Sequence, residues 1–221
     1  MKRLLSNNQC LVRSFRLIFL LAAVGLSINI HAQTPRATSL SAISTHSVAP
    51  VKYSVDANHS TVGFSVPILD GVSSVKGKFT DFSVDINFDE TDVTKSSVTA
   101  TIKATSIDTG VEARDKHLRT ADFFEVEKYP EITFQSAKIV TKGKGFIAIG
   151  TFTMHGVSKQ ISIPFTSTGK FYNPITKKKL MGFSAKLQLD RREYGMTWKH
   201  SAVPNWVGDL VTIELDILVR T

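Results

Sequence analysis

Hydrophobic and polar residues alternate along most of the chain beyond its N-terminal part. The clearest runs are residues 82–88, 98–102, 161–165, 183–190 and 211–219. Such alternation places one face of a strand on an apolar interior and the other face in water. Turn-forming residues, such as glycines and Asn-Pro, separate the runs. The pattern predicts at least about seven or eight antiparallel strands, which favours a closed barrel or a sandwich.

Aromatic content bears on the choice between these two folds. The chain has 14 Phe and 2 Trp, most of them within residues 51–221. A small barrel of about eight strands either fills its lumen with side chains or holds one small ligand. Because the rings are more numerous than a packed core demands, the composition favours a barrel with an apolar lumen.

Residues 106–130 interrupt the alternation. Asp122 is placed to cap a short helix, with Glu125 as its capping-box partner, and Tyr129-Pro130 is expected to end that helix. Long loops inside compact domains are uncommon and usually functional, often as a lid over a site. We therefore expect one helical and loop excursion here, close to a functional site.

The N-terminal part has the pattern of an export signal. Basic residues precede residues 17–30, an uncharged apolar run that is shorter than the roughly 20 residues needed to cross a bilayer. A secretory signal peptide over residues 1–32, cleaved after Ala32, fits this pattern, and an uncleaved anchor is the alternative. Residues 33–50 resemble a flexible linker. The domain then covers residues 51–221, with no membrane span left after cleavage.

Charge and cysteine content change once these segments are separated. The whole chain has 27 Lys+Arg against 19 Asp+Glu, a net charge of +8. Four of the basic residues lie in the signal segment and one in the linker, which leaves the domain at +3. We therefore expect no nucleic acid partner. The single cysteine, Cys10, lies ahead of the apolar run, so neither a disulfide framework nor a lipoprotein cysteine at the cleavage point is expected.

Catalytic and metal-binding motifs are not found in the sequence. The histidines lack the spacing of a zinc site, and no nucleophile elbow, phosphate-binding loop or dinucleotide fingerprint occurs. We expect no metal and no cofactor. Asp115 and His117 could form an acid/base couple in a lipid-acting enzyme, but a solvated, salt-bridged loop explains them equally well. In the enzyme, His117→Ala would abolish turnover and leave ligand binding intact.

Several short motifs occur together in the domain, and the block in the excursion is the most specific of them. In chain order they are Tyr53 to Asp56, Asn58-His59-Ser60, Val62-Gly63-Phe64, Val75 to Phe79, Ser106 to Gly110, Arg114 to Arg119, Asp122-Phe123-Phe124, Lys128-Tyr129-Pro130, Gly150 to Thr153, His155 to Lys159, Gly182-Phe183, Arg191, Tyr194-Gly195 and Val207-Gly208-Asp209. With these motifs, residues 53–219 resemble the YceI-like family.

The resemblance implies an all-β fold, a lipocalin-like, eight-stranded antiparallel barrel exported to the bacterial periplasm. It implies a protein that sequesters or transports a long apolar amphiphile, such as a polyisoprenoid or fatty-acid derivative, with no established catalytic residue or cofactor. The chain departs from the family pattern at Val66-Pro67-Ile68 and at Arg192 to Gly195, two places that are expected to shape the mouth of the pocket. The sequence leaves open whether the protein is a monomer or a homodimer.

Two sets of residues are the candidate binding site. We expect a polar set near the mouth of the barrel to meet an anionic or polar head group, with Asp115 fixing the first arginine. Its members are Arg114, Asp115, His117 and Arg119. The alternative is that these residues only hold the excursion on the barrel. We expect an apolar set to line the lumen, namely Phe64, Phe79, Phe82, Phe123, Phe124, Phe134, Phe152, Phe183 and Trp198. A third reading is a filled structural barrel that acts through protein contacts.

Overall fold

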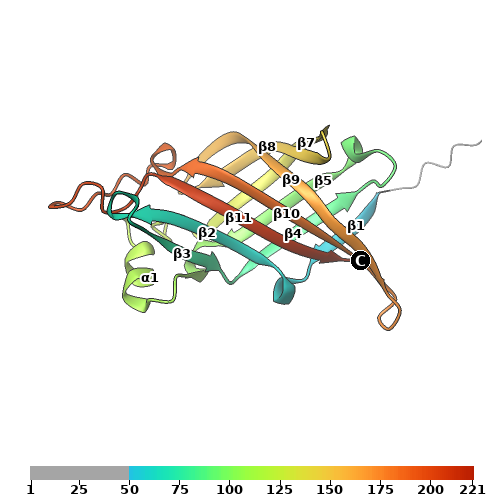
Figure 1. Ribbon diagram of the computed structural model, residues 1–221, viewed down its shortest axis with the longest axis horizontal. Coiled ribbons are helices and arrows are strands. Elements are labelled where there is room, and N and C mark those ends of the chain that lie inside the picture. The colour runs from blue at the N-terminus through green and yellow to red at the C-terminus, as the bar shows by residue number, and fades with distance from the viewer. Residues whose placement is uncertain (1–49) are drawn as a thin grey trace, which may run out of the picture. The chain divides into compact units, whose positions relative to one another are not determined.

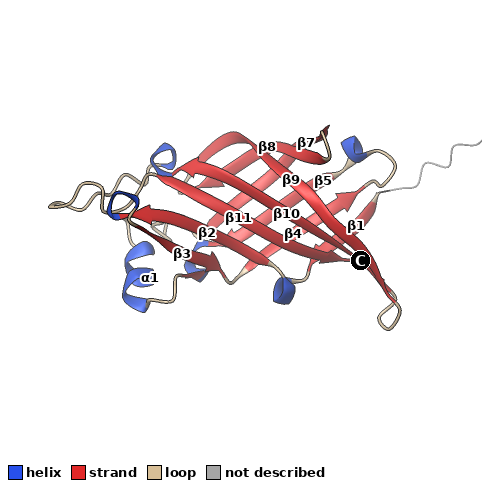
Figure 2. Ribbon diagram, in the orientation of Figure 1, coloured by secondary structure: helices blue, strands red, loops and turns tan. Residues whose placement is uncertain are grey.

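The computed structural model describes residues 50–221, and these form an antiparallel β-barrel with one α-helix at its end (Figures 1 and 2). The predicted signal peptide and nearly all of the predicted linker lie outside the described residues. The strands are β1 Val51–Val55, β2 Thr61–Ile68, β3 Ser73–Phe79, β4 Phe82–Phe88, β5 Ser97–Lys103, β6 Ile107–Asp108, β7 Glu131–Lys142, β8 Gly145–Met154, β9 Val157–Asn173, β10 Lys178–Asp190 and β11 Leu210–Arg220. The helix is α1, Glu112–Leu118.

Eight strands close the barrel, in the order β1-β4-β5-β7-β8-β9-β10-β11. The ring closes where β1 meets β11, with Val55 opposite Val219. This confirms the predicted fold class. The other three strands are continuations. β2 follows β1 along β11, β3 pairs with β2 and is continued by β4, and β6 pairs with β3 and continues β5. The first three strands of the barrel are thus each broken into two segments.

Side chains and backbone groups bridge the breaks in these strands. Between β1 and β2, the Ser60 hydroxyl donates to the Asp56 carbonyl and accepts from the Leu218 amide. Between β5 and β6, the Ala104 amide donates to the carbonyl of Pro130. These bonds satisfy polar backbone groups that the sheet ladder leaves free. Beyond the break, β6 pairs with β3 only, so the strand pairing ends there and the excursion follows.

The helix in the excursion begins eleven residues earlier than predicted, since its N-cap is Val111 and not Asp122. Asp122 caps no helix, because its carboxylate bonds to His117 at 2.8 Å. Glu125 has φ of +45°, a left-handed conformation that a right-handed helix cannot contain. The backbone after α1 instead forms successive turns, in which Phe124 donates to the carbonyl of Leu118. The capping-box prediction was wrong because Asp122 and Glu125 lie in these turns, where the Asp122 carboxylate bonds to the His117 side chain and not to a helix amide.

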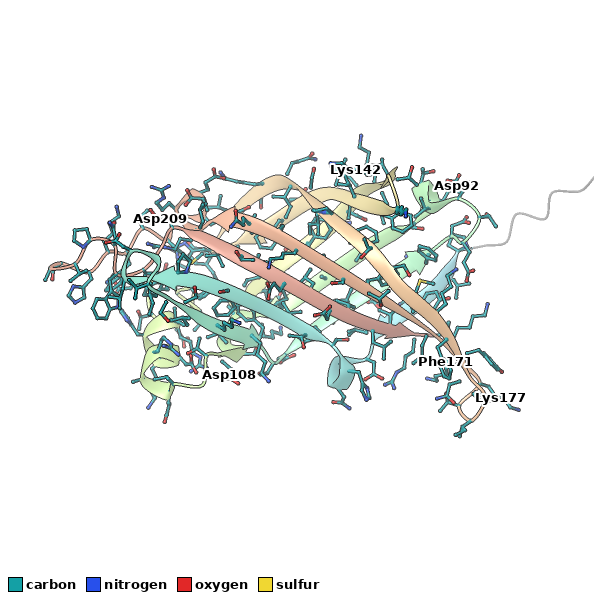
Figure 3. All side chains as sticks on the ribbon, viewed as in Figure 1. Asp92, Asp108, Lys142, Phe171, Lys177 and Asp209 are labelled. Carbon is teal, nitrogen blue, oxygen red and sulfur yellow. The ribbon has the colours of Figure 1, made fainter. Side chains whose placement is uncertain are left out.

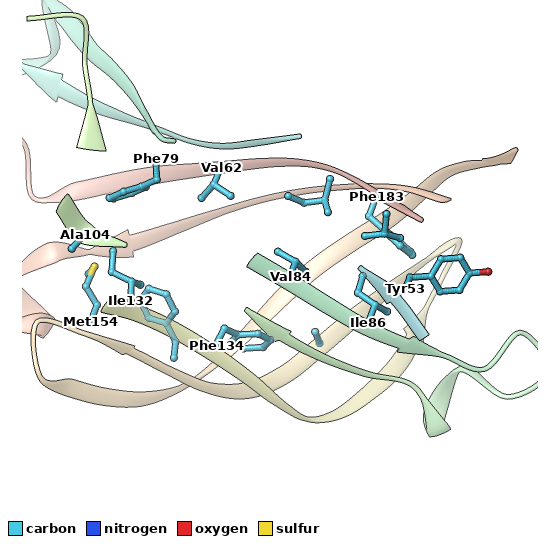
Figure 4. Packing of buried hydrophobic residues seen from close by; sticks show 14 of the residues in the cluster. Tyr53, Val62, Phe79, Val84, Ile86, Ala104, Ile132, Phe134, Met154 and Phe183 are labelled. Carbon is cyan, nitrogen blue, oxygen red and sulfur yellow. The ribbon is translucent and has the colours of Figure 1, made fainter. Parts of the chain in front are cut away.

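The hydrophobic core lies inside the barrel. Figure 4 shows Val62 and Phe79 facing Ile132 and Phe134 from the opposite wall. The barrel strands present every second residue to the interior. On β4, for example, Val84, Ile86 and Phe88 are all buried.

Candidate functional site

The interior of the barrel contains an apolar cavity of about 350 Å³. This volume is within the range of small-molecule sites, about 300–1,000 Å³. Inward-facing residues of the strands form its walls, and the polar side chains that line it, tryptophans aside, are Arg114, His117, Ser184 and Arg191. A cavity with so few polar groups favours an apolar ligand over water.

One end of the barrel is filled. Tyr53, Met181 and Val219 are almost completely buried and pack near the seam between β1 and β11, and none of them lines the cavity. At the other end the lining reaches solvent, because it includes His117 and Trp206, whose side chains are both partly exposed. The cavity therefore opens at the end that carries α1 (Figure 1).

Three segments surround this mouth. They are the excursion at residues 109–130, the turn between β2 and β3, and the connection between β10 and β11, which we call the mouth segment (residues 191–209). The turn and the mouth segment are joined by backbone contacts, since Ile68 bridges to Val207 and the Leu69 amide donates to the Trp206 carbonyl at 3.2 Å. The rim of the mouth is thus a hydrogen-bonded structure.

Arg191 holds the mouth segment together. Its guanidinium donates to the backbone carbonyls of Met196 and Gly208 and forms an ion pair with Asp209 at 2.9 Å. The side chain is almost completely buried, and this burial lowers the pKa of Arg191 while the carboxylate of Asp209 opposes the shift. Several fixed acceptors around one planar cation keep both ends of the mouth segment in place.

Arg114 and His117 come to the mouth from α1 and line the cavity. The Arg114 Nε donates to the Thr109 hydroxyl at 2.7 Å and Nη2 to the Thr109 carbonyl at 3.0 Å. These bonds use two of the five guanidinium N–H groups and leave three that can donate. His117 Nε2 lies 2.8 Å from Asp122, and the ring contacts Phe123 and Trp198, with centroids 5.1 and 5.3 Å away.

Asp115 and Arg119 belong to the same block but do not line the cavity. Asp115 is buried and accepts from the amide and hydroxyl of Thr109, so it reaches Arg114 only through that threonine. The expected direct contact between Asp115 and Arg114 is not formed. Arg119 donates to the backbone carbonyls of Thr105 and Ile107, both at 2.8 Å. Arg119 therefore attaches the excursion to the barrel, whereas Asp115 holds the start of the excursion against α1.

The structure also separates Asp115 from His117. The hydrogen-bond partner of His117 is Asp122, whereas Asp115 is occupied by Thr109. The acid/base couple considered from the sequence is therefore not formed.

Most of the predicted aromatic set surrounds the lumen. The residues that line the cavity are Phe64, Phe79, Phe123, Phe124, Phe134, Phe152, Phe183 and Trp198. The exception is Phe82, which packs against the core without lining the cavity. The rings contact one another along the wall, with Phe79 5.8 Å from both Phe64 and Phe124.

Four mouth residues were not assigned from the sequence, namely Arg191, Met196, Trp206 and Val207. Arg191 and Val207 stand within the motifs that carry the family resemblance, which was the available signal. Met196 and Trp206 lie in a connection without periodicity, so no pattern pointed to them.

Within residues 50–221, no group of three or more His, Cys, Asp or Glu is arranged to hold a metal ion. The helices of that part are all too short or too polar to cross a membrane.

Comparisons with known proteins agree with this geometry. The YceI-like domain matches residues 53–219. The "UPF0312 protein" of Serratia proteamaculans is 32% identical over 174 residues, which cover 78% of this chain and 90% of the relative. The crystal structure of the Campylobacter jejuni YCEI protein has 29% identity and a TM-score of 0.61, with 68% of this chain and 86% of that chain covered.

A third similar structure is described as a polyisoprenoid binding domain from Saccharophagus degradans. It has 17% identity and a TM-score of 0.53, and the match covers 76% of this chain and 97% of that chain. At this identity the likeness concerns the fold. The names of these three proteins include no enzymatic activity.

Proposed function

The chain belongs to the YceI-like family, and from that premise we propose that it binds a long-chain apolar amphiphile in its lumen and sequesters or transports it. The observation that carries the proposal is the apolar cavity of about 350 Å³, which is filled at one end and reaches solvent at the other. The polyisoprenoid binding domain with a similar fold supports the ligand class. An isoprenoid or a fatty-acid derivative has the required shape.

Binding energy would come from the tail of the ligand. Burial of a methylene group in an apolar site contributes about 0.8 kcal/mol, so ten methylenes give roughly 8 kcal/mol before the costs of association. Micromolar binding needs about 8 kcal/mol net. Ligands somewhat longer than about ten carbons therefore fit a carrier that must both take up and release its cargo.

Orientation would come from the mouth. Arg114 has three free N–H groups beside the lumen, and His117 lies close by, so an anionic or polar head group is the natural partner. The proposed compartment is the periplasm, supported by the signal-like pattern of residues 1–32.

Extraction of the natively purified protein tests this proposal. Organic extraction followed by mass spectrometry is expected to give one amphiphile in stoichiometric amount, with a chain of at least about ten carbons. A natively purified protein that yields no amphiphile, and takes none up when offered fatty acids or isoprenoids, would contradict the proposal. That result would favour a structural barrel that acts through protein contacts.

A further inference from the structure

The β9–β10 hairpin stands clear of the barrel at the end opposite the mouth (Figures 1 and 3). β9 pairs with β8 only as far as Phe165, and the hairpin beyond it turns at residues 174–177. Phe171, Tyr172 and Ile175 are exposed at 62%, 56% and 89%. Side chains of this kind are costly in water unless something covers them.

The turn of the hairpin is preorganised. The Asn173 side-chain oxygen accepts from the amides of Ile175 and Thr176, at 2.9 and 3.1 Å. These bonds fix the backbone and direct Ile175 to the tip, and Lys177 completes the turn with φ of +56°. The apolar tip, which consists of Ile175 in the turn and Phe171 and Tyr172 on the strand before it, is therefore a fixed feature of the fold.

Three consecutive lysines follow the tip. Lys177, Lys178 and Lys179 are all exposed, and none of them forms an ion pair with another described residue. Lys178 also lines a hollow of about 460 Å³ at the base of the hairpin, together with Arg220. The one carboxylate lining that hollow, Asp56, is already paired with Arg220 and His59, both at 3.2 Å. The hairpin thus combines apolar side chains with unpaired positive charge.

We propose that this hairpin docks the protein on an anionic phospholipid bilayer. The apolar tip would enter the interface, where tyrosine and other aromatic rings are favoured. The lysines would extend their stems along it and place their ammonium groups at the phosphates. Charge complementarity argues for this partner. The area that three apolar side chains on a narrow hairpin can bury is also far smaller than the roughly 800 Å² per partner of a stable protein interface.

Docking by this end directs the mouth away from the bilayer, because α1 and the mouth segment lie at the other end of the barrel (Figure 1). Cargo would then pass between the mouth and a partner or membrane on the far side. The docking itself does not depend on the proposed ligand, and vesicle binding is measured separately from ligand extraction.

Vesicle binding by the exported protein, purified after removal of the predicted signal peptide over residues 1–32, tests the proposal, because the basic and apolar residues of that peptide would themselves bind an anionic bilayer. The parent is expected to sediment with vesicles of phosphatidylglycerol and phosphatidylcholine much more than with phosphatidylcholine alone. The triple variant Lys177→Glu/Lys178→Glu/Lys179→Glu is expected to bind the anionic vesicles at least roughly one hundred times more weakly, at about fivefold for each lysine. The matched control is Lys138→Glu/Lys142→Glu/Lys144→Glu, an equal charge change on exposed lysines of β7 and of the β7–β8 turn, which should retain most of the binding.

A local probe separates the hairpin from every other part of the chain. The exported protein is expected to have no cysteine, because Cys10 lies in the predicted signal peptide, so Ile175→Cys and Lys144→Cys can each carry one environment-sensitive fluorophore. Anionic vesicles should shift the emission to the blue at position 175 and leave position 144 unchanged. The proposal is overturned if the hairpin triple variant binds like the parent, or if the probe at position 175 stays in water.

Discussion

Adjacent residues of one short helix have different roles at the mouth of the barrel. Arg114 and His117 line the lumen, and Arg114 also donates to Thr109, whereas the Asp115 and Arg119 side chains bond to the segment that precedes the helix and do not line the lumen. The reason is helical geometry, since neighbours along a helix point about 100° apart. The two hypotheses for this block, a head-group site and an attachment of the excursion, therefore apply to different residues within it.

Paired arginine variants test this division. Arg114→Ala should weaken binding of an amphiphile with an anionic head by roughly ten- to one-hundredfold, because a hydrogen bond to a charged group contributes about 1.5–3 kcal/mol. Arg119→Ala should leave affinity unchanged and lower Tm by roughly 3–10 °C, because the backbone carbonyls of Thr105 and Ile107 lose the guanidinium that donates to them. Titration with a long-chain fatty acid and thermal unfolding measure the two effects. Unchanged affinity with lower stability in Arg114→Ala would refute the head-group role.

At the scale of elements, the mouth segment depends on contacts far from it in sequence. Residues 196–208 contain no regular helix or strand, yet the segment is held by the buried Arg191 at one end and by the β2–β3 turn near the other. Gly208 also has to be glycine, since a Cβ there would lie 2.7 Å from the Pro67 ring. A segment attached at defined points can open locally while the barrel stays folded.

Replacement of Arg191 should open the mouth segment. Arg191→Met removes the donors to Met196, Gly208 and Asp209 and should destabilise the fold by about 3 kcal/mol. Amide hydrogen exchange should rise in residues 195–209 more than in the barrel strands. The control is the exposed neighbour Arg192→Met, whose loss of ion pairs with Asp190 and Asp209 should cost less than about 1 kcal/mol. Equal exchange in the two variants would show that Arg191 does not hold the segment.

At the scale of the whole molecule, the fold divides the barrel into a filled end and an open end. Tyr53, Met181 and Val219 occupy the first, and the cavity occupies the rest up to the mouth. The filled end supplies a conventional core, so the open end need not contribute all of the packing that stability requires. This division allows a barrel of ordinary stability to keep space for a ligand.

Filling the cavity should remove binding without unfolding the protein. Ala185 on β10 lines the lumen, and Ala185→Phe places a ring where the tail of the ligand would lie. Competition of this kind should cost about 1–3 kcal/mol of binding, or roughly five- to one-hundred-and-fiftyfold in affinity, with Tm close to that of the parent. Gln188→Phe, on the outer face of the same strand, should leave affinity unchanged. Full binding by Ala185→Phe would place the ligand outside the lumen.

The amino-acid sequence by itself determined an antiparallel β-fold, a barrel or a sandwich, together with the position of the excursion and most of the aromatic lining. These features follow from period-two alternation, which is a local property, because inward-facing residues on any strand of a closed barrel meet the same lumen. The family motifs added the eight-stranded barrel and the expected class of ligand.

Only the tertiary structure decided which polar side chains face the cavity. The helix lies at Glu112–Leu118, and no helix follows Asp122, whose carboxylate bonds to His117 and which is followed by Glu125 in a left-handed conformation. The mouth depends on Arg191 and on backbone bonds between Leu69 and Trp206, which are far apart in the chain. Hydrogen bonds of this kind depend on distances between segments, and those distances exist only once the barrel has closed.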